Sequence, residues 1–160
     1  MEIPEQQKMF MRRAIDLSRL KMHENSGGPF GAVIVKGSRI IAEGWNHVTS
    51  SCDPTAHAEV EAIRAACKVL NTFSLKGCEI YTSCEPCPMC LGAIYWAHLD
   101  QIYYANTRKD AAAIGFDDDF LYQEISLPEE KRSKKTSRLL SADAWMVFEE
   151  WQIKADKVQY

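Results

Sequence analysis

Residues 82–92 read Thr-Ser-Cys-Glu-Pro-Cys-Pro-Met-Cys-Leu-Gly, and this stretch joins an expected strand to an expected helix. Residues 79–83 are rich in β-formers, residues 88–97 are apolar and begin with proline, and residues 101–105 are rich in β-formers again. A strand, helix and strand in this order imply a crossover between two parallel strands. The stretch therefore predicts an α/β fold, in which helices flank a sheet.

The chain before this unit carries the same two kinds of pattern. Residues 5–22 place apolar side chains at helical spacing, and residues 30–35 and 40–45 are β-rich runs on either side of Lys36-Gly37-Ser38. The two runs are expected to form a hairpin. Asp53-Pro54 supplies an N-cap and a first-turn proline, so we expect the next helix to start there.

The pattern weakens beyond residue 106. Short helical stretches are expected near residues 110 and 120, and a longer amphipathic one covers residues 141–154. The chain contains no internal repeat, low-complexity tract or linker, and 160 residues suit one globular domain. We therefore expect residues 1–160 to form a single domain.

Composition narrows the function classes. Hydrophobic residues make up 46% and charged residues 26% of the chain, which is typical of a folded globular domain. No apolar segment approaches the ~18 residues of a membrane span, and the N-terminus lacks the pattern of a signal peptide. These features predict a cytoplasmic protein without a membrane partner. The net charge of −3 argues against nucleic acid, and the basic cluster in residues 131–138 is interpreted as solvated surface.

The cysteines point to a metal rather than to disulfides. In a reducing compartment the six cysteines are expected to be unpaired. Cys87 and Cys90 are three residues apart in the first turn of the expected helix, so both sulfurs share one face. The positive end of the helix dipole favours the thiolates that a metal requires. Cys84 lies at the end of the preceding strand and is interpreted as a small packing residue.

Two other cysteine sites fit poorly. A ferredoxin-type iron–sulfur cluster would need a fourth cysteine followed by proline, where this chain has Ile94 and Tyr95. A structural zinc held by four cysteines would need a second close pair. The remaining cysteines are scattered singly, at Cys52, Cys67 and Cys78.

His57 is the best candidate for the missing ligand. It begins one expected helix, and Cys87 and Cys90 begin another at the same edge of the sheet. Three protein ligands leave a zinc position open for water, whose pKa then falls towards ~7 so that it becomes a hydroxide nucleophile. Glu59 lies two residues from His57 and is predicted to shuttle the protons. His-x-Glu followed by Pro-Cys-x-x-Cys is the signature of zinc nucleobase and nucleoside deaminases.

The sequence also resembles a known family. Residues 44–46 (Gly-Trp-Asn), 53–59 (Asp-Pro-Thr-Ala-His-Ala-Glu) and 82–90 resemble the cytidine deaminase-like superfamily. Residues 91–96 (Leu-Gly-Ala-Ile-Tyr-Trp) and 114–118 (Ile-Gly-Phe-Asp-Asp) are similar to the bacterial guanine deaminases in it. The resemblance spans most of the chain and implies a three-layer α/β/α fold, with a mixed sheet and helices on both faces.

The resemblance further implies a reaction and a set of residues. Guanine would be hydrolysed to xanthine and ammonia, with zinc hydroxide attacking C2. Asn46 and Phe30 are expected to bind the purine, and Asp118 to assist proton transfer. Members of this family exchange C-terminal segments, so we expect a homodimer in which residues 130–160 cross over and Tyr160 closes the partner's site.

Other functions remain open at this stage. Guanosine deamination would use the same site with room for a ribose, and the first half of the chain is also similar to tRNA adenosine deaminases. The latter would be expected to carry a more basic surface. A zinc-stabilised interaction domain without activity would explain the ligands but would leave Glu59 without a role.

Overall fold

The computed structural model describes residues 3–160. The chain divides into two compact units, Met1–Tyr122 and Gln123–Tyr160, which are described separately. Because the chain forms two compact units, the expectation that residues 1–160 form a single domain stays a prediction.

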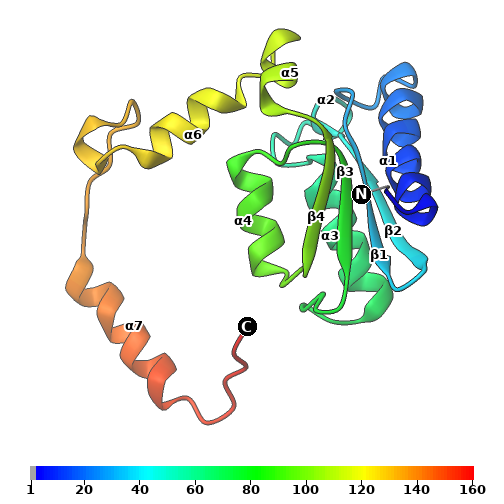
Figure 1. Cartoon of the computed structure of the whole chain (residues 1–160). Coiled ribbons are helices and arrows are strands. Elements are labelled where there is room, and N and C mark those ends of the chain that lie inside the picture. Colours follow the sequence, from blue (N-terminus) through cyan, green and yellow to red (C-terminus); the bar gives the residue numbers. More distant parts are fainter. Residues whose placement is uncertain (1–2) are drawn as a thin grey trace. The chain divides into compact units, whose positions relative to one another are not determined.

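The first unit holds most of the regular structure (Figure 1). Its elements are α1 (Glu5–His23), β1 (Gly31–Lys36), β2 (Arg39–Trp45), α2 (Val48–Ser51), α3 (Ala58–Leu70), β3 (Glu79–Cys84), α4 (Pro88–Trp96), β4 (Gln101–Asn106), α5 (Arg108–Ala113) and the start of α6 (Asp118–Ser126).

Four strands form one mixed sheet in the order β2-β1-β3-β4. β1 pairs antiparallel with β2 and with β3, whereas β3 and β4 pair in parallel. The parallel pair is joined through α4, which confirms the crossover predicted from the sequence. The carboxyl end of β3 and the N-terminus of α4 therefore meet at one edge of the sheet, where ligands commonly bind in α/β proteins.

Helices cover both faces of the sheet (Figure 1). On one face, α1 packs Phe10 and Leu17 against Val33 and Tyr81. On the other face, the side chains of α3 and α4 enclose Ile34, Ile80 and several alanines. This arrangement confirms the predicted three-layer α/β/α fold.

Small residues let α3 lie close to the sheet. A Cβ atom added at Gly44 of β2 would lie 2.2 Å from the carbonyl oxygen of Ala58 and 2.4 Å from the nitrogen of Ala62. Alanines 58, 62 and 66 all lie buried along the same side of α3. The close approach holds the N-terminus of α3 against the edge of the sheet at which β3 ends.

The start of α3 differs from the prediction. The helix begins at Ala58 rather than at Asp53. Asp53 instead accepts hydrogen bonds from the backbone nitrogen and the hydroxyl of Thr55, at 2.8 and 2.7 Å, and so forms an Asx turn. Because the side chain of Asp53 accepts hydrogen bonds within this turn, it does not cap the helix. His57 is the N-cap residue instead.

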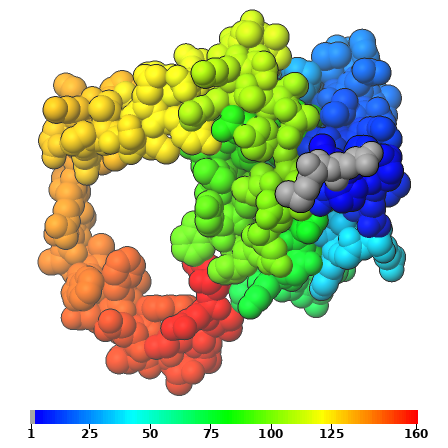
Figure 2. All heavy atoms as spheres, viewed as in Figure 1, coloured from blue at the N-terminus to red at the C-terminus, as the bar shows by residue number. Residues whose placement is uncertain are grey.

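The second unit contains the end of α6, a 3₁₀ turn at Glu129–Lys131 and α7 (Ser141–Ile153). Large apolar side chains of α7 are exposed, among them Trp145 at 54% and Phe148 at 63%. Figure 2 shows this stretch in orange and red, with all its atoms drawn. No residue of α7 is buried. Across residues 3–160, no helix is long and apolar enough to span a bilayer.

Candidate metal centre and active site

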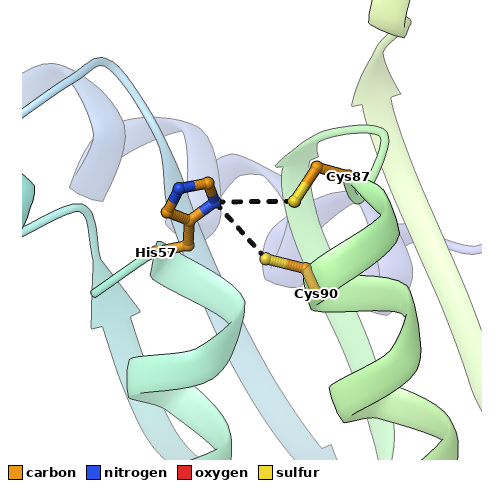
Figure 3. Close-up of side chains that lie close together, drawn as sticks. All are labelled: His57, Cys87 and Cys90. Carbon is orange, nitrogen blue, oxygen red and sulfur yellow. Dashed lines mark hydrogen bonds between the residues drawn. The ribbon is translucent and has the colours of Figure 1, made fainter. Parts of the chain in front are cut away.

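Two helix N-termini bring three ligand side chains together (Figure 3). His57 is the N-cap residue of α3, and Cys87 is the N-cap residue of α4. Cys90 lies three residues further on, in the first turn of α4. Pro88 occupies the first turn of the same helix, where its missing N–H leaves no bond unmade. The two sulfurs and the imidazole consequently face one another.

The spacing of these atoms fits a zinc ion. His57 Nδ1 lies 3.7 Å from Cys87 Sγ and 3.5 Å from Cys90 Sγ. All three donor atoms lie within 4.8 Å of one another. Zinc–sulfur bonds of about 2.3 Å and zinc–nitrogen bonds of about 2.0 Å at a tetrahedral angle separate sulfur from nitrogen by roughly 3.5 Å. The donor set and its dimensions therefore suit tetrahedral zinc with one open position.

The electrostatics of the cluster favour a thiolate. The pKa of Cys87 is lowered to about 4, chiefly by a hydrogen bond from the Cys90 thiol and further by His57. The hydrogen bond with Cys87 and burial raise the pKa of Cys90. The hydrogen bond with Cys87 also raises the pKa of His57. The surroundings of Cys87 thus favour its thiolate form, which is the form that binds a metal.

Glu59 lies beside this cluster in a buried position. Its side chain projects from the first turn of α3 and is only 6% exposed. Thr82 of β3 donates a hydrogen bond to Glu59 Oε1 at 2.9 Å. Burial raises the pKa of the Glu59 carboxyl, with its hydrogen-bond donors acting in the opposite direction. A buried carboxyl with a raised pKa is suited to accept and return a proton.

A cavity of about 660 Å³ opens onto His57, Glu59 and Cys87. Phe30 and Phe116 form part of its wall and meet edge to face, with ring centroids 4.8 Å apart. Asp118 also lines the cavity, and burial raises the pKa of its carboxyl. The structure thus brings Phe30 and Asp118 to the same cavity as the ligands.

Asn46 lies at the end of β2 and is 5% exposed. Its Oδ1 accepts hydrogen bonds from the backbone nitrogens of Gly28, at 3.1 Å, and Val48, at 3.2 Å. Two donors on one atom identify it as the oxygen, so the Nδ2 amino group is left for the cavity that Asn46 lines. The side chain therefore offers a ligand a donor and not an acceptor.

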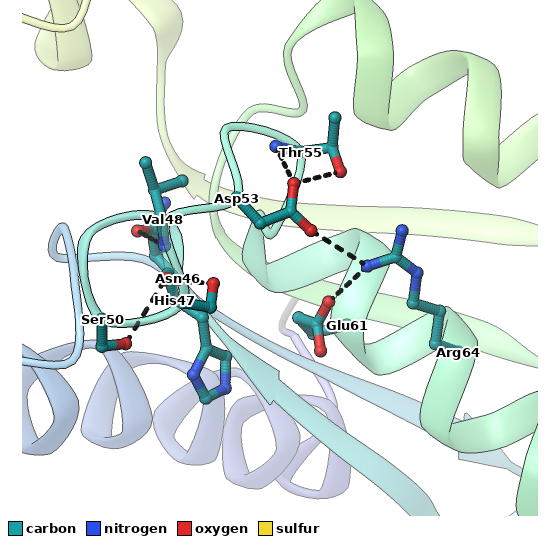
Figure 4. A network of polar contacts seen from close by, with 9 residues as sticks. Asn46, His47, Val48, Ser50, Asp53, Thr55, Glu61 and Arg64 are labelled. Carbon is teal, nitrogen blue, oxygen red and sulfur yellow. Dashed lines mark hydrogen bonds and ion pairs between the residues drawn. The ribbon is translucent and has the colours of Figure 1, made fainter.

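The loop after β2 is braced by further polar contacts (Figure 4). Arg64 Nη1 lies 3.9 Å from Asp53 Oδ2, and it also forms an ion pair with Glu61 Oε1 at 2.7 Å. Ser51 Oγ donates to the carbonyl of His47 at 2.7 Å. These contacts connect the loop that carries Asn46 to the helix that carries His57.

Some predicted residues lie elsewhere, and others were missed. Tyr160 belongs to the second unit and is 77% exposed, so its role stays a prediction. Cys84 is 3% exposed and lines the cavity, and burial raises the pKa of its thiol to about 11. Phe116 and Thr82 were not predicted from the sequence. Phe116 lies inside the quoted stretch 114–118, and Thr82 is a hydroxyl in an apolar strand.

Comparison with known proteins agrees with this geometry. Residues 4–106 match the model of the cytidine and deoxycytidylate deaminase zinc-binding region. The chain is 52% identical over 151 residues to a guanine deaminase of Bacillus subtilis, covering 94% of this chain and 97% of that protein. It is 46% identical to a tRNA-specific adenosine deaminase of Aquifex aeolicus, over 51% of this chain and 54% of that protein.

A solved structure supports the same grouping. The X-ray structure of guanine deaminase from Bacillus subtilis superposes with a TM-score of 0.93 at 52% identity, covering 96% of this chain and 98% of that one. The similarity thus extends beyond the zinc-binding region to almost the whole chain.

Proposed function

Because the chain belongs to the cytidine and deoxycytidylate deaminase family, and within it to the guanine deaminases, we propose that it hydrolyses guanine to xanthine and ammonia. The observation that carries the proposal is the buried carboxyl of Glu59, which lines the same cavity as the metal ligands. A zinc centre that only held the fold together would not need an acid beside it.

The metal would be held by His57, Cys87 and Cys90. Zinc bound there would lower the pKa of a water molecule to about 7 and so supply a nucleophile at neutral pH. The reaction forms a bond between that water's oxygen and C2 and breaks the bond between C2 and the amino nitrogen.

Glu59 moves the protons in this proposal. One proton of the attacking water must reach N3 of the purine, and the other must reach the departing amino nitrogen, which leaves as ammonia. Glu59 accepts each proton in turn and passes it on, because its carboxyl lines the same cavity as the metal ligands. Asp118 faces the same cavity and assists the second transfer. Asp118→Asn is expected to lower turnover at saturating guanine, and normal turnover would remove this role.

The cavity wall positions the base. Phe30 and Phe116 offer apolar ring surfaces to a flat purine. The Nδ2 group of Asn46 donates to one of the acceptors of the ring, because Oδ1 is already held by two backbone nitrogens. A base so held presents the same carbon to the metal centre in every encounter.

Glu59→Gln is the direct test of this mechanism. The amide has nearly the same shape but cannot carry a proton, so ammonia release from guanine should fall by roughly 100-fold or more. Zinc content, measured by metal analysis, should stay at the wild-type value. Wild-type turnover in the variant would contradict the proton-transfer role, and a wild type that releases no ammonia from any purine would contradict the enzyme itself.

We further propose a homodimer in which residues 130–160 are exchanged and Tyr160 closes the partner's cavity. Three features support the exchange. α7 exposes four consecutive large apolar side chains, at residues 145–148, together with Trp151 and Ile153, and an apolar helix surface is normally buried against a partner. α4 contains no charged residue and exposes Tyr95 and Trp96 at 73% and 68%. The cavity of the first unit is also larger than a purine base, so a lid would exclude water.

Sedimentation and two changes at Tyr160 test the dimer. Deletion of Tyr160 should leave folding and zinc content intact but cut guanine turnover sharply, because the ring and the terminal carboxylate are both lost. Tyr160→Phe keeps both and should be much less affected. An active monomer, or an unchanged rate in the deletion, would count decisively against the exchange.

We also propose a cytoplasmic location, on the ground that all six cysteines are unpaired. Thiol alkylation in a freshly lysed, unreduced extract should modify all of them after denaturation. A disulfide-bonded chain in that extract would argue for another compartment.

A further inference from the structure

On the face of the sheet that lies under α3, β3 carries a buried polar side chain, Thr82, next to the apolar core. Side chains alternate along β3, so Ile80, Thr82 and Cys84 point to the same face. Ile80 belongs to the apolar core beneath α3, and Cys84 lines the cavity. Thr82 lies between them and is completely buried. A buried hydroxyl is unfavourable unless it finds a hydrogen-bond partner.

The partner of this hydroxyl is the carboxyl of Glu59. The Oγ1 atom of Thr82 donates to Glu59 Oε1 at 2.9 Å, and both side chains are buried. A hydrogen bond to an ionised acceptor is about twice as strong as one between neutral groups. The bond joins β3, whose carboxyl end lies at the edge of the sheet that holds the site, to the first turn of α3.

A bound metal makes this contact more important. Besides Thr82, which donates to Glu59 Oε1, the thiol of Cys90 lies close enough to the Glu59 carboxyl to influence its pKa. A cysteine that ligates zinc is a thiolate and has no proton to donate. Only the hydroxyl of Thr82, among these two, still holds the carboxyl once the metal is in place.

We propose that Thr82 is a positioning residue for the deamination, because its hydroxyl fixes one oxygen of Glu59 and leaves the other to carry protons. This role rests on the proposed function. A carboxyl held at one oxygen can take up few orientations, so the free oxygen meets the water and the purine at a constant distance. Displacement of a reacting group by 1 Å can cost roughly 100-fold in rate.

Two substitutions separate the hydroxyl from the rest of the side chain. Thr82→Val keeps the shape and removes the hydroxyl, whereas Thr82→Ser keeps the hydroxyl and removes a methyl group. Thr82→Val is expected to lower kcat for guanine roughly 10- to 100-fold, with KM changed less than about twofold and zinc content unchanged. Thr82→Ser should retain kcat within about threefold while losing thermal stability, since it leaves a small cavity.

A second readout does not depend on activity. Tm is measured for Thr82→Val in the wild-type background and in Glu59→Ala, both loaded with zinc. Removal of the hydroxyl should lower Tm when Glu59 is present and should leave Tm unchanged or raise it when the carboxyl is absent. Equal shifts in the two backgrounds would mean that Thr82 only packs, and would overturn the proposal.

Activity measurements distinguish the role of Thr82 from the proposed guanine deamination. A wild type that deaminates guanine, together with a Thr82→Val variant of equal kcat, would overturn the role of Thr82 alone. The role of Thr82 would also be overturned if kcat fell in both Thr82→Val and Thr82→Ser in proportion to the loss of Tm. A wild type without any deaminase activity would overturn the proposed function, and with it the role of Thr82 in catalysis.

Discussion

The two units of the chain differ in where their apolar side chains lie. In the first unit, helices on both faces of the sheet enclose a core that includes Phe10, Leu17, Ile34 and Ile80, each at most 2% exposed. In the second unit, by contrast, the aromatic residues of α7 are exposed: Trp145 by 54%, Phe148 by 63% and Trp151 by 42%. The first unit therefore encloses an apolar core, whereas no residue of α7 in the second unit is buried.

The proposed reaction and the proposed assembly therefore depend on different units of the chain. The ligands, Glu59 and the cavity wall all belong to the first unit, so the metal centre and the acid need nothing from residues 123–160. The second unit instead carries exposed apolar surface of the kind that normally marks a binding interface. We expect changes in the first unit to affect metal and stability, and changes in the second to affect assembly.

The largest effect is expected at the metal ligands. Cys87→Ser or Cys90→Ser should remove zinc and reduce ammonia release to background, because the remaining two ligands cannot retain the ion. The control is Cys84→Ser, which changes a nearby cavity thiol that lies outside the ligand cluster, and which should keep its zinc. Full zinc occupancy in the ligand variants, with loss in Cys84→Ser, would show that the ligand assignment is wrong.

The next effect concerns the exposed helix of the second unit. Phe148→Glu places a charge on α7 where an apolar partner surface is proposed, so the chain should sediment as a monomer and lose at least tenfold in guanine turnover. Zinc content and the circular dichroism of the first unit should stay unchanged. Glu150→Gln, on the same helix, should leave the dimer intact. A Phe148→Glu dimer of wild-type activity would break the proposed division between the units.

A smaller effect is expected inside the core of the first unit. Gly44→Ala brings a Cβ atom to 2.2 Å from the carbonyl oxygen of Ala58, so strand and helix must separate. The free energy of unfolding should fall by roughly 1 to 3 kcal/mol. Gly92→Ala is the matched control, because a Cβ atom there meets nothing within 4 Å and alanine favours the helix. Equal stability of the two variants in a urea titration would contradict this packing.

The smallest effect is a pH dependence at the start of α5. Backbone and side-chain hydrogen bonds from Thr107 lower the pKa of Asp110. Since the folded pKa lies below the unfolded value, about 3.9, the stabilisation is complete above that value and is lost as the pH falls through the folded pKa. Asp110→Asn should therefore make the acid unfolding of the first unit less steep.

Glu124 offers the corresponding test in the second unit. Hydrogen bonds from Ser133 lower its pKa in the same way. Glu124→Gln should leave the acid unfolding of the first-unit core unchanged, because it belongs to the other unit. A change in that core's acid midpoint equal to that of Asp110→Asn would indicate that the two units unfold together.

The sequence predicted the fold well where local and tertiary preferences agree. β1, β2, β3 and β4 begin and end within about one residue of their predicted limits, because their β-rich runs also lie in a buried sheet. The ligand set was predictable for a similar reason, since two helix starts at one sheet edge must bring their first turns together.

The remaining features depend on contacts that no local pattern reveals. Asp53-Pro54 looked like a helix start, but the side chain of Asp53 bonds to Thr55 and delays the helix to Ala58. The bond between Thr82 and Glu59 joins residues 23 positions apart and becomes visible only when strand and helix pack. α7 was correctly predicted as a helix, but the sequence did not show that its apolar side chains would be exposed rather than packed in a core.

We propose above that the metal centre of the first unit deaminates guanine. Ammonia release by the zinc-loaded chain, measured under one set of conditions with guanine, guanosine, adenosine in a tRNA anticodon stem, and cytidine, tests it most directly. We expect guanine to be turned over well above all the others, and Glu59→Gln to lose that activity with its zinc retained. Turnover of guanosine or of the tRNA well above that of guanine would contradict the proposed function. So would the absence of ammonia release from all four substrates.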